Sequence, residues 1–215
     1  NGVKYYFASN GKAYRNTTKK VGKIYARFDE NGAYQITASY CMVNGRKMQV
    51  QYRTDPQVSD EILLAAILYA EAGGERQTAL SATLNQETIR VYKGQLAVGY
   101  TILNRMASRS YPPTVKEIVY AQYQFEPART GALLKDQTRI STECRNTAKL
   151  LLKDYKAAQD SVKEFPRSEF TWCNFWALSY ARNYSDFFSV YKKNEYQIIG
   201  NQVFFNYTKT IHSQS

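Results

Sequence analysis

The chain has 215 residues, 44% of them hydrophobic, which is enough for a sizeable core in one domain or in a domain with a small module. No stretch approaches the roughly 18 uninterrupted apolar residues of a membrane span, and we expect no signal peptide at the N-terminus. The net charge of +11 favours a polyanionic partner, namely nucleic acid, an anionic membrane or an anionic cell wall, unless it only solvates the surface.

The first 54 residues carry most of this charge, with 10 Lys or Arg against 2 acidic residues, whereas the remainder has 19 against 16. They also contain an imperfect repeat with a period of about 21 residues, because "GVKYYFASNGKAY" aligns with "GKIYARFDENGAY". Aromatic and β-branched residues around the Asn-Gly pairs at Asn10 and Asn31 predict one β-hairpin in each unit. A third pair, at Asn44, predicts a further hairpin.

A polar stretch with a proline, "RTDPQVSD" (53–60), predicts a boundary between a hairpin module at 1–54 and a second domain at 55–215. Ser59 or Asp60 can cap a helix through "EILLAAILYAEA", which we expect to end at the following glycine pair.

Three further helices and a β element follow. The expected segments are a helix over 94–108, a short helix opened by a capping box at Thr114–Glu117, a helix from Ser141, and one or two strands over 195–207. The fold class predicted from this order is α+β, a mainly helical domain with a small β element after a β-hairpin module.

The histidine and cysteine content disfavours several kinds of hydrolase. His212 is the sequence's one histidine, so a zinc site or a Cys-His or Ser-His pair would depend on a residue near the end of the chain. There is no P-loop and no Gly-rich dinucleotide turn, and we expect neither a metal nor a cofactor. The three cysteines, Cys41, Cys144 and Cys173, are interpreted mainly as buried thiols, with one disulfide plus a free thiol left open.

Carboxylate chemistry remains, and Glu71 in "YAEAGGE" (69–75) is well placed for it. The C-terminal end of a helix and apolar neighbours both disfavour the ionised carboxylate, so they keep a proton on the acid. A protonated carboxylic acid is required to cleave a glycosidic bond, because the leaving oxygen must be protonated. The alternative is an exposed acid at a helix end with no catalytic role.

Four stretches of the chain resemble the SleB-type cell-wall hydrolases, which include the spore-cortex-lytic enzymes. In order, they are "YAEAGGE" (69–75), "GQLAVGYTILNRM" (94–106), "YPPTVKEIVY" (111–120) and "QFEPARTGAL" (124–133). The resemblance covers roughly residues 60–205 and implies a lysozyme-like fold. It also implies that Glu71 is the catalytic acid, with Glu75 as the second Glu of the family motif.

The activity that this resemblance implies is lytic transglycosylation of peptidoglycan, with cleavage between MurNAc and GlcNAc and a 1,6-anhydro-MurNAc product. One carboxyl group is enough, since Glu71 would act first as acid and then as base. A muramidase that uses water would need a second carboxylate, for which Glu75, Glu126 and Asp136 are candidates. The sequence also leaves open a non-catalytic wall-binding protein and, from its charge alone, a nucleic-acid-binding protein.

The resemblance also implies substrate contacts. Gln124 and Phe125 match a Gln-Phe pair that shapes the saccharide groove, although packing alone would also explain them. In "TWCNF", Trp172 is a candidate for stacking on a sugar and Asn174 for binding an acetamido group. We expect Tyr69, beside the acid, to form a wall of the cleft.

Three features depart from the family pattern. An insertion at 76–93 adjoins the acid. The alternatives for its role are a substrate lid, a partner-docking loop or an inert surface loop. Glu126 stands where relatives often have a small residue, and it could supply the second acid of a hydrolase. Gln202 stands where relatives often have His.

The N-terminal "KYYFASNGKAY" (4–14) resembles the cell-wall-binding repeats of secreted bacterial hydrolases and toxins. Both tryptophans lie far downstream, at Trp172 and Trp176, which disfavours a choline cage. The implied partners are peptidoglycan glycan strands and, through the basic repeats, anionic wall polymers, with no nucleic acid and with an accessory protein left open. A hairpin appendage without a ligand is the alternative. The implied location is outside the cell, in the bacterial wall or the spore envelope.

Overall fold

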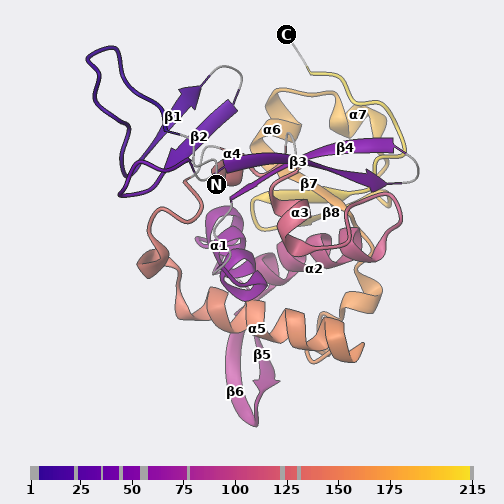
Figure 1. Cartoon of the computed structure of the whole chain (residues 1–215). Coiled ribbons are helices and arrows are strands. Elements are labelled where there is room, and N and C mark those ends of the chain that lie inside the picture. Colours follow the sequence, from indigo (N-terminus) through magenta and orange to yellow (C-terminus); the bar gives the residue numbers. More distant parts are fainter. Residues whose placement is uncertain are drawn as a thin grey trace.

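The computed structural model describes residues 5–21, 24–34, 36–43, 46–53, 58–76, 78–121, 124–129 and 132–213. The helices are α1 (Asp60–Ala72), α2 (Lys93–Ala107), α3 (Val115–Val119), α4 (Glu126–Arg129), α5 (Thr142–Ala157), α6 (Leu178–Asn183) and α7 (Phe187–Val190). The strands are β1 (Thr17–Val21), β2 (Ile24–Phe28), β3 (Ile36–Val43), β4 (Arg46–Arg53), β5 (Ala79–Leu84), β6 (Glu87–Tyr92), β7 (Asn174–Ala177), β8 (Tyr196–Ile199) and β9 (Gln202–Phe205). Helices and small antiparallel sheets are thus combined, and the predicted α+β class is confirmed (Figure 1).

Helix α1 runs through the centre of the main core. Its first turn is fixed by Ser59, whose side chain accepts a hydrogen bond from the backbone N–H of Ile62 at 3.2 Å. Residues 63–68 are all buried, because α2, α3 and α5 contact the helix from different sides. The helix ends where Gly73 donates its N–H to the carbonyl oxygen of Tyr69 at 2.9 Å. The predicted helix is confirmed, and its last turn contains Glu71.

The other predicted helices are also present, with local capping of α3 and α5. Thr114 caps α3 by accepting from the N–H of Glu117 at 3.2 Å, and Ser141 caps α5 by accepting from the N–H of Cys144 at 3.3 Å. Helix α2 has almost entirely buried residues from 94 to 105 and lies between α1, α3 and α5. These helices pack around α1.

The three-stranded sheet β7-β9-β8 joins the main core to a second, smaller one. Its central strand β9 is buried along its whole length. Phe204 belongs to the main core, whereas Val203 and Phe205 pack with Phe187 in the smaller cluster. This alternation follows from the two-residue repeat of a strand, which directs neighbouring side chains to opposite faces. Strands β8 and β9 confirm the β element predicted at 195–207.

The insertion forms the hairpin β5-β6, which projects beyond α5 in Figure 1. Asn85 and Gln86 turn the chain with φ angles of 51° and 72°, as a two-residue hairpin turn requires. The buried side chains of the hairpin, Ala82, Leu84 and Ile89 among them, join the main core, and strand β6 contacts α5. The hairpin therefore enlarges the core, and none of its residues lines the cleft described below.

The N-terminal units contain matching turns. Gly11 and Gly32 have φ angles of 76° and 84°, and each donates its N–H to a carbonyl three residues earlier, that of Ala8 or Asp29. Each turn is closed by a single bridge, while the longer ladder β1-β2 connects one unit to the next. The sequence predicted a full hairpin in each unit. Instead, each predicted hairpin has only one bridge, and the longer pairing is the ladder between β1 and β2. Phe28 is fully buried among the rings of neighbouring tyrosines.

The third predicted hairpin is present as β3-β4, with Val43 opposite Arg46. Its Asn-Gly turn lies outside the described residues, as does most of the predicted domain boundary, at 54–57. Strand β4 contacts α3, so the hairpin lies against the helical part. The division into 1–54 and 55–215 stays a prediction.

Candidate active site

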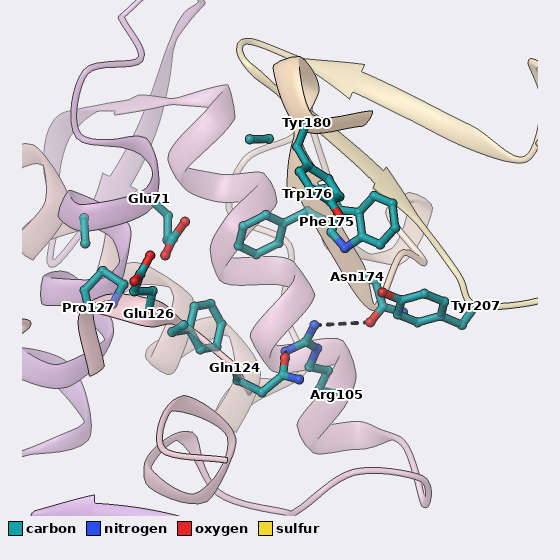
Figure 2. A pocket seen from close by; sticks show the side chains of 13 residues that line it. Glu71, Arg105, Gln124, Glu126, Pro127, Asn174, Phe175, Trp176, Tyr180 and Tyr207 are labelled. Carbon is teal, nitrogen blue, oxygen red and sulfur yellow. Dashed lines mark hydrogen bonds between the residues drawn. The ribbon is translucent and has the colours of Figure 1, made fainter. Parts of the chain in front are cut away.

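A cleft of about 730 Å³ opens between the end of α1, the segment leading into α4, and the strand β7 with the helix α6 that follows it (Figure 2). Its lining residues are Ala70, Glu71, Arg105, Gln124, Phe125, Glu126, Pro127, Asn174, Phe175, Trp176, Ala177, Tyr180 and Tyr207. A cleft of this size fits a ligand with several rings. It brings together five residues predicted for the site from sequence: Glu71, Gln124, Phe125, Glu126 and Asn174.

Glu71 is the half-buried acid of the cleft. Burial raises the pKa of its carboxyl group above the ordinary value, and the nearby negative charge of Glu126 raises this pKa further. Figure 2 shows the two carboxyl groups on the same side of the cleft. No basic residue lies in the last turn of α1 to offset these effects. The surroundings of Glu71 therefore favour the protonated acid, as expected from its position in the sequence.

Gln202 of β9 holds the backbone that carries this acid. Its side-chain Nε2 donates a hydrogen bond to the carbonyl oxygen of Glu71 at 3.2 Å, across 131 positions of the chain. A carbonyl in the last turn of a helix has no partner within the helix, and Gln202 supplies one. Gln202 thus fixes the end of α1.

Glu75 does not line the main cleft but a second cavity of about 160 Å³, which is also lined by Glu71 and Gln202. Its side chain fills the space beside two glycines, because a Cβ atom at Gly94 or at Gly200 would overlap it. The second Glu of the sequence motif is therefore packed between the start of α2 and the turn that joins β8 to β9.

Arg105 lies at the floor of the cleft and is 5% exposed. Its Nε donates to the carbonyl oxygen of Cys173 at 2.5 Å, its Nη1 to Oε1 of Gln124 at 2.7 Å and its Nη2 to Oδ1 of Asn174 at 3.3 Å. Tyr111 also donates to Oδ1 of Asn174, at 3.3 Å. Burial lowers the pKa of the guanidinium. Our sequence interpretation missed Arg105, whose signal was a charge within an otherwise apolar helix.

Aromatic rings form the other side of the cleft, where Trp176 meets Tyr180 at a ring-centroid distance of 5.2 Å. Trp172, the tryptophan singled out from sequence, does not line the cleft. It packs on the main core, and its Nε1 donates to Oε1 of Gln197 at 3.2 Å. Tyr69 also packs on the core without lining the cleft.

Asp136 lies outside the cleft and caps a 3₁₀ turn at Gln137–Arg139. A hydrogen bond from the side chain of Thr138 lowers the pKa of its carboxyl group. An exposed, stabilised carboxylate of this kind is poorly suited to serve as the second acid of the site.

Comparison with known protein families identifies the family of the chain. The sequence model of the family described as Cell Wall Hydrolase matches residues 90–205, which is more than half of the chain. The chain belongs to this family. No curated protein and no solved structure matches it.

As a cell wall hydrolase, the protein is a peptidoglycan-cleaving enzyme that acts at the cell wall. The matched residues include Arg105, Gln124, Asn174 and Gln202, while Glu71 lies before the match begins. Within the part of the chain that was described, no helix has the length and apolar character needed to cross a bilayer.

The described part of this cell wall hydrolase offers no cluster of three or more His, Cys, Asp or Glu residues that could hold a metal ion. His212 is exposed and lines no part of the cleft. Cys144 is a buried free thiol and Cys173 a half-buried one, and burial raises the pKa of both. The side chain of Cys41 lies outside the described residues.

Proposed function

We propose that this enzyme is a lytic transglycosylase that cleaves the bond between MurNAc and GlcNAc with Glu71 as its catalytic acid. The observation that carries the proposal is the raised pKa of Glu71 in a large cleft, with burial as the main cause and Glu126 as the second. A raised pKa keeps more of the acid protonated at a given pH, and only the protonated acid can protonate a leaving oxygen.

The proposed reaction uses one carboxyl group twice. Glu71 donates its proton to the glycosidic oxygen as the bond from that oxygen to C1 of MurNAc breaks. The resulting carboxylate then removes the proton of the C6 hydroxyl of the same sugar, and the C6 oxygen attacks C1. The 1,6-anhydro ring forms, the acid is regenerated and no water is consumed. Gln202 would support both steps by holding the backbone of Glu71.

A muramidase reaction is the second candidate, favoured by the presence of Glu126 beside Glu71. A second carboxylate can activate water or form a covalent intermediate, depending on its distance from the acid. Glu126 begins the short helix α4 and is exposed at the cleft, so water has access to it.

The products distinguish the two reactions. We expect purified sacculi treated with the enzyme to release muropeptides that end in anhydro-MurNAc, each lighter by one water than the hydrolysis product. Mass spectrometry, before and after borohydride reduction, measures this directly, because only hydrolysis creates a reducible end. Reducible muropeptides as the main product would contradict the transglycosylase and support the muramidase. Release of neither product would favour a wall-binding protein or a required accessory protein.

The pH dependence tests the role of Glu126. In Glu126→Gln the like charge beside Glu71 is removed, so the pKa of Glu71 falls, although burial still keeps it raised. Because the acid must be protonated, kcat of the variant should begin to decline at a lower pH than in the wild type. We expect kcat at the optimum to fall by no more than about tenfold, whereas loss of a general base would lower it by roughly 10²–10⁴-fold.

The control for this experiment is Glu87→Gln, which removes a carboxylate at the exposed turn of the hairpin β5-β6. Its pH profile should match that of the wild type. An unshifted profile in Glu126→Gln would contradict the proposed coupling, and a loss in the larger range would assign Glu126 to catalysis.

We also propose that the basic N-terminal units contact anionic polymers of the wall or spore envelope, and that the catalytic part has a lysozyme-like fold. Support for the wall contact comes from the excess of Lys and Arg in residues 1–54 and from the exposed rings of Tyr5 and Phe7.

A further inference from the structure

Arg105 is a buried cation whose three described hydrogen bonds all go to uncharged oxygens: a backbone carbonyl and two side-chain amides. The ion pairs found among the described residues involve other cations, such as Arg76 with Glu143 and Lys209 with Glu195. Burying a charge without an opposite charge is unfavourable. Because Arg105 lies at the floor of the cleft, this unfavourable burial indicates a role for Arg105 in binding.

The guanidinium determines how the two amides face. An arginine side chain has only donors, so the amides of Gln124 and Asn174 must direct their oxygens toward it, as the described distances show. Tyr111 reinforces this for Asn174, because its hydroxyl donates to the same oxygen. The amide nitrogens then face away from Arg105, and both residues line the cleft. Neither nitrogen meets an acceptor among the described residues.

We propose that Arg105 is a positioning residue that turns Gln124 and Asn174 into a pair of fixed N–H donors, and that these donors bind a carbonyl or carboxylate oxygen on a sugar substituent. The positive charge behind the amides strengthens their attraction for such an oxygen. This inference rests on the proposed function, since a peptidoglycan strand carries two such groups. They are the acetamido carbonyl of either sugar and the lactyl carboxylate of MurNAc.

The sharpest test is Asn174→Asp, which keeps the shape of the side chain. One carboxylate oxygen can still accept from Arg105, now as an ion pair, while the other replaces the NH₂ donor by an acceptor. We therefore expect the melting temperature to stay the same or rise, while Kd for the sugar ligand increases about 10- to 100-fold. A variant that binds weakly because it folds poorly would instead have a lower melting temperature.

Binding is measured by calorimetry in the Glu71→Gln background, so that the ligand is not cleaved. The two probes are peptide-free GlcNAc–MurNAc oligomers, which carry free lactyl carboxylates, and chitotetraose, which carries acetamido groups alone. The matched control is Gln197→Glu, an equivalent amide-to-carboxylate change at a residue that bonds Trp172 and lies outside the cleft. The control should bind both probes as its parent does.

Weaker binding of both probes to Asn174→Asp would assign the acetamido carbonyl, and weaker binding of the oligomers alone would assign the lactyl carboxylate. Unchanged Kd for both probes would overturn the donor site. A parent that binds neither probe would contradict the proposed function as well, so the two failures are distinguishable.

The role of Arg105 has its own readout. Arg105→Lys retains a positive charge but lacks the planar fork that holds two amides at once. In the active enzyme we expect KM to rise about tenfold or more while kcat stays within a few-fold of wild type, because binding geometry is affected and Glu71 is not. A fall in kcat at unchanged KM would contradict a positioning role in binding.

Discussion

Replacing Glu71 by Gln should lower kcat for peptidoglycan cleavage by roughly 10²–10⁴-fold, because an amide cannot deliver a proton to the leaving oxygen. The substitution preserves the size of the side chain, and the bond from Gln202 involves the backbone of residue 71, so the fold and the binding of sacculi should persist. Release of soluble muropeptides over time, with a parallel pull-down of sacculi, measures both properties.

The stability of the same variant relative to wild type should rise with pH. The pKa of Glu71 is raised in the folded state, so its contribution to stability is fully present below the pKa of the unfolded chain. That contribution is lost as the pH rises through the folded pKa, because the buried carboxyl must then ionise. Glutamine does not ionise, so the melting temperature of Glu71→Gln relative to wild type should increase between pH 4 and pH 8.

The control for both measurements is Glu87→Gln, a carboxylate at the exposed hairpin turn, which should change neither kcat nor the pH dependence of the melting temperature. If Glu71→Gln kept more than about a tenth of the wild-type kcat, the assignment of Glu71 as the catalytic acid would be wrong.

Truncating Phe204 to Ala should destabilise the protein by about 3–5 kcal/mol and lower its melting temperature by about 6 to 20 °C. Phe204 is fully buried in the central strand β9, with its ring 5.3 Å from that of Phe170 and 5.6 Å from that of Phe175. Phe175 in turn contacts Phe125, and both line the cleft. The cavity left by truncation therefore lies directly behind the cleft wall.

Thermal unfolding monitored by calorimetry tests this prediction, with Phe188→Ala as the matched control. Phe188 is 36% exposed, so its truncation should cost much less. Equal shifts in the two variants would show that Phe204 does not have the central packing role we assign to it.

Local signals in the sequence were sufficient to predict the helices and the position of Glu71. Ser59 and the glycine pair delimit α1, and Thr114 and Ser141 begin α3 and α5, because a cap depends on residues only three or four positions apart. Placing Glu71 in the last turn of α1 followed from these boundaries alone.

Contacts between distant segments could not be predicted in the same way. Nothing local distinguishes Trp172, which packs on the core, from Trp176, which lines the cleft, since both belong to one aromatic stretch. Gln202 contacts the backbone of Glu71 only because β9 is brought against the end of α1. Likewise, Arg105 of α2 donates to Gln124, which precedes α4, and to Asn174 of β7, and sequence spacing carries no information about that arrangement.

The two sides of the cleft differ chemically, with Glu71 and Glu126 on one side and Asn174, Trp176 and Tyr207 on the other (Figure 2). A glycan strand also has two unlike ends, one reducing and one non-reducing. If the proposed function holds, the two directions of a bound strand would place different substituents against the acids and against the rings, so the cleft would favour one direction over the other.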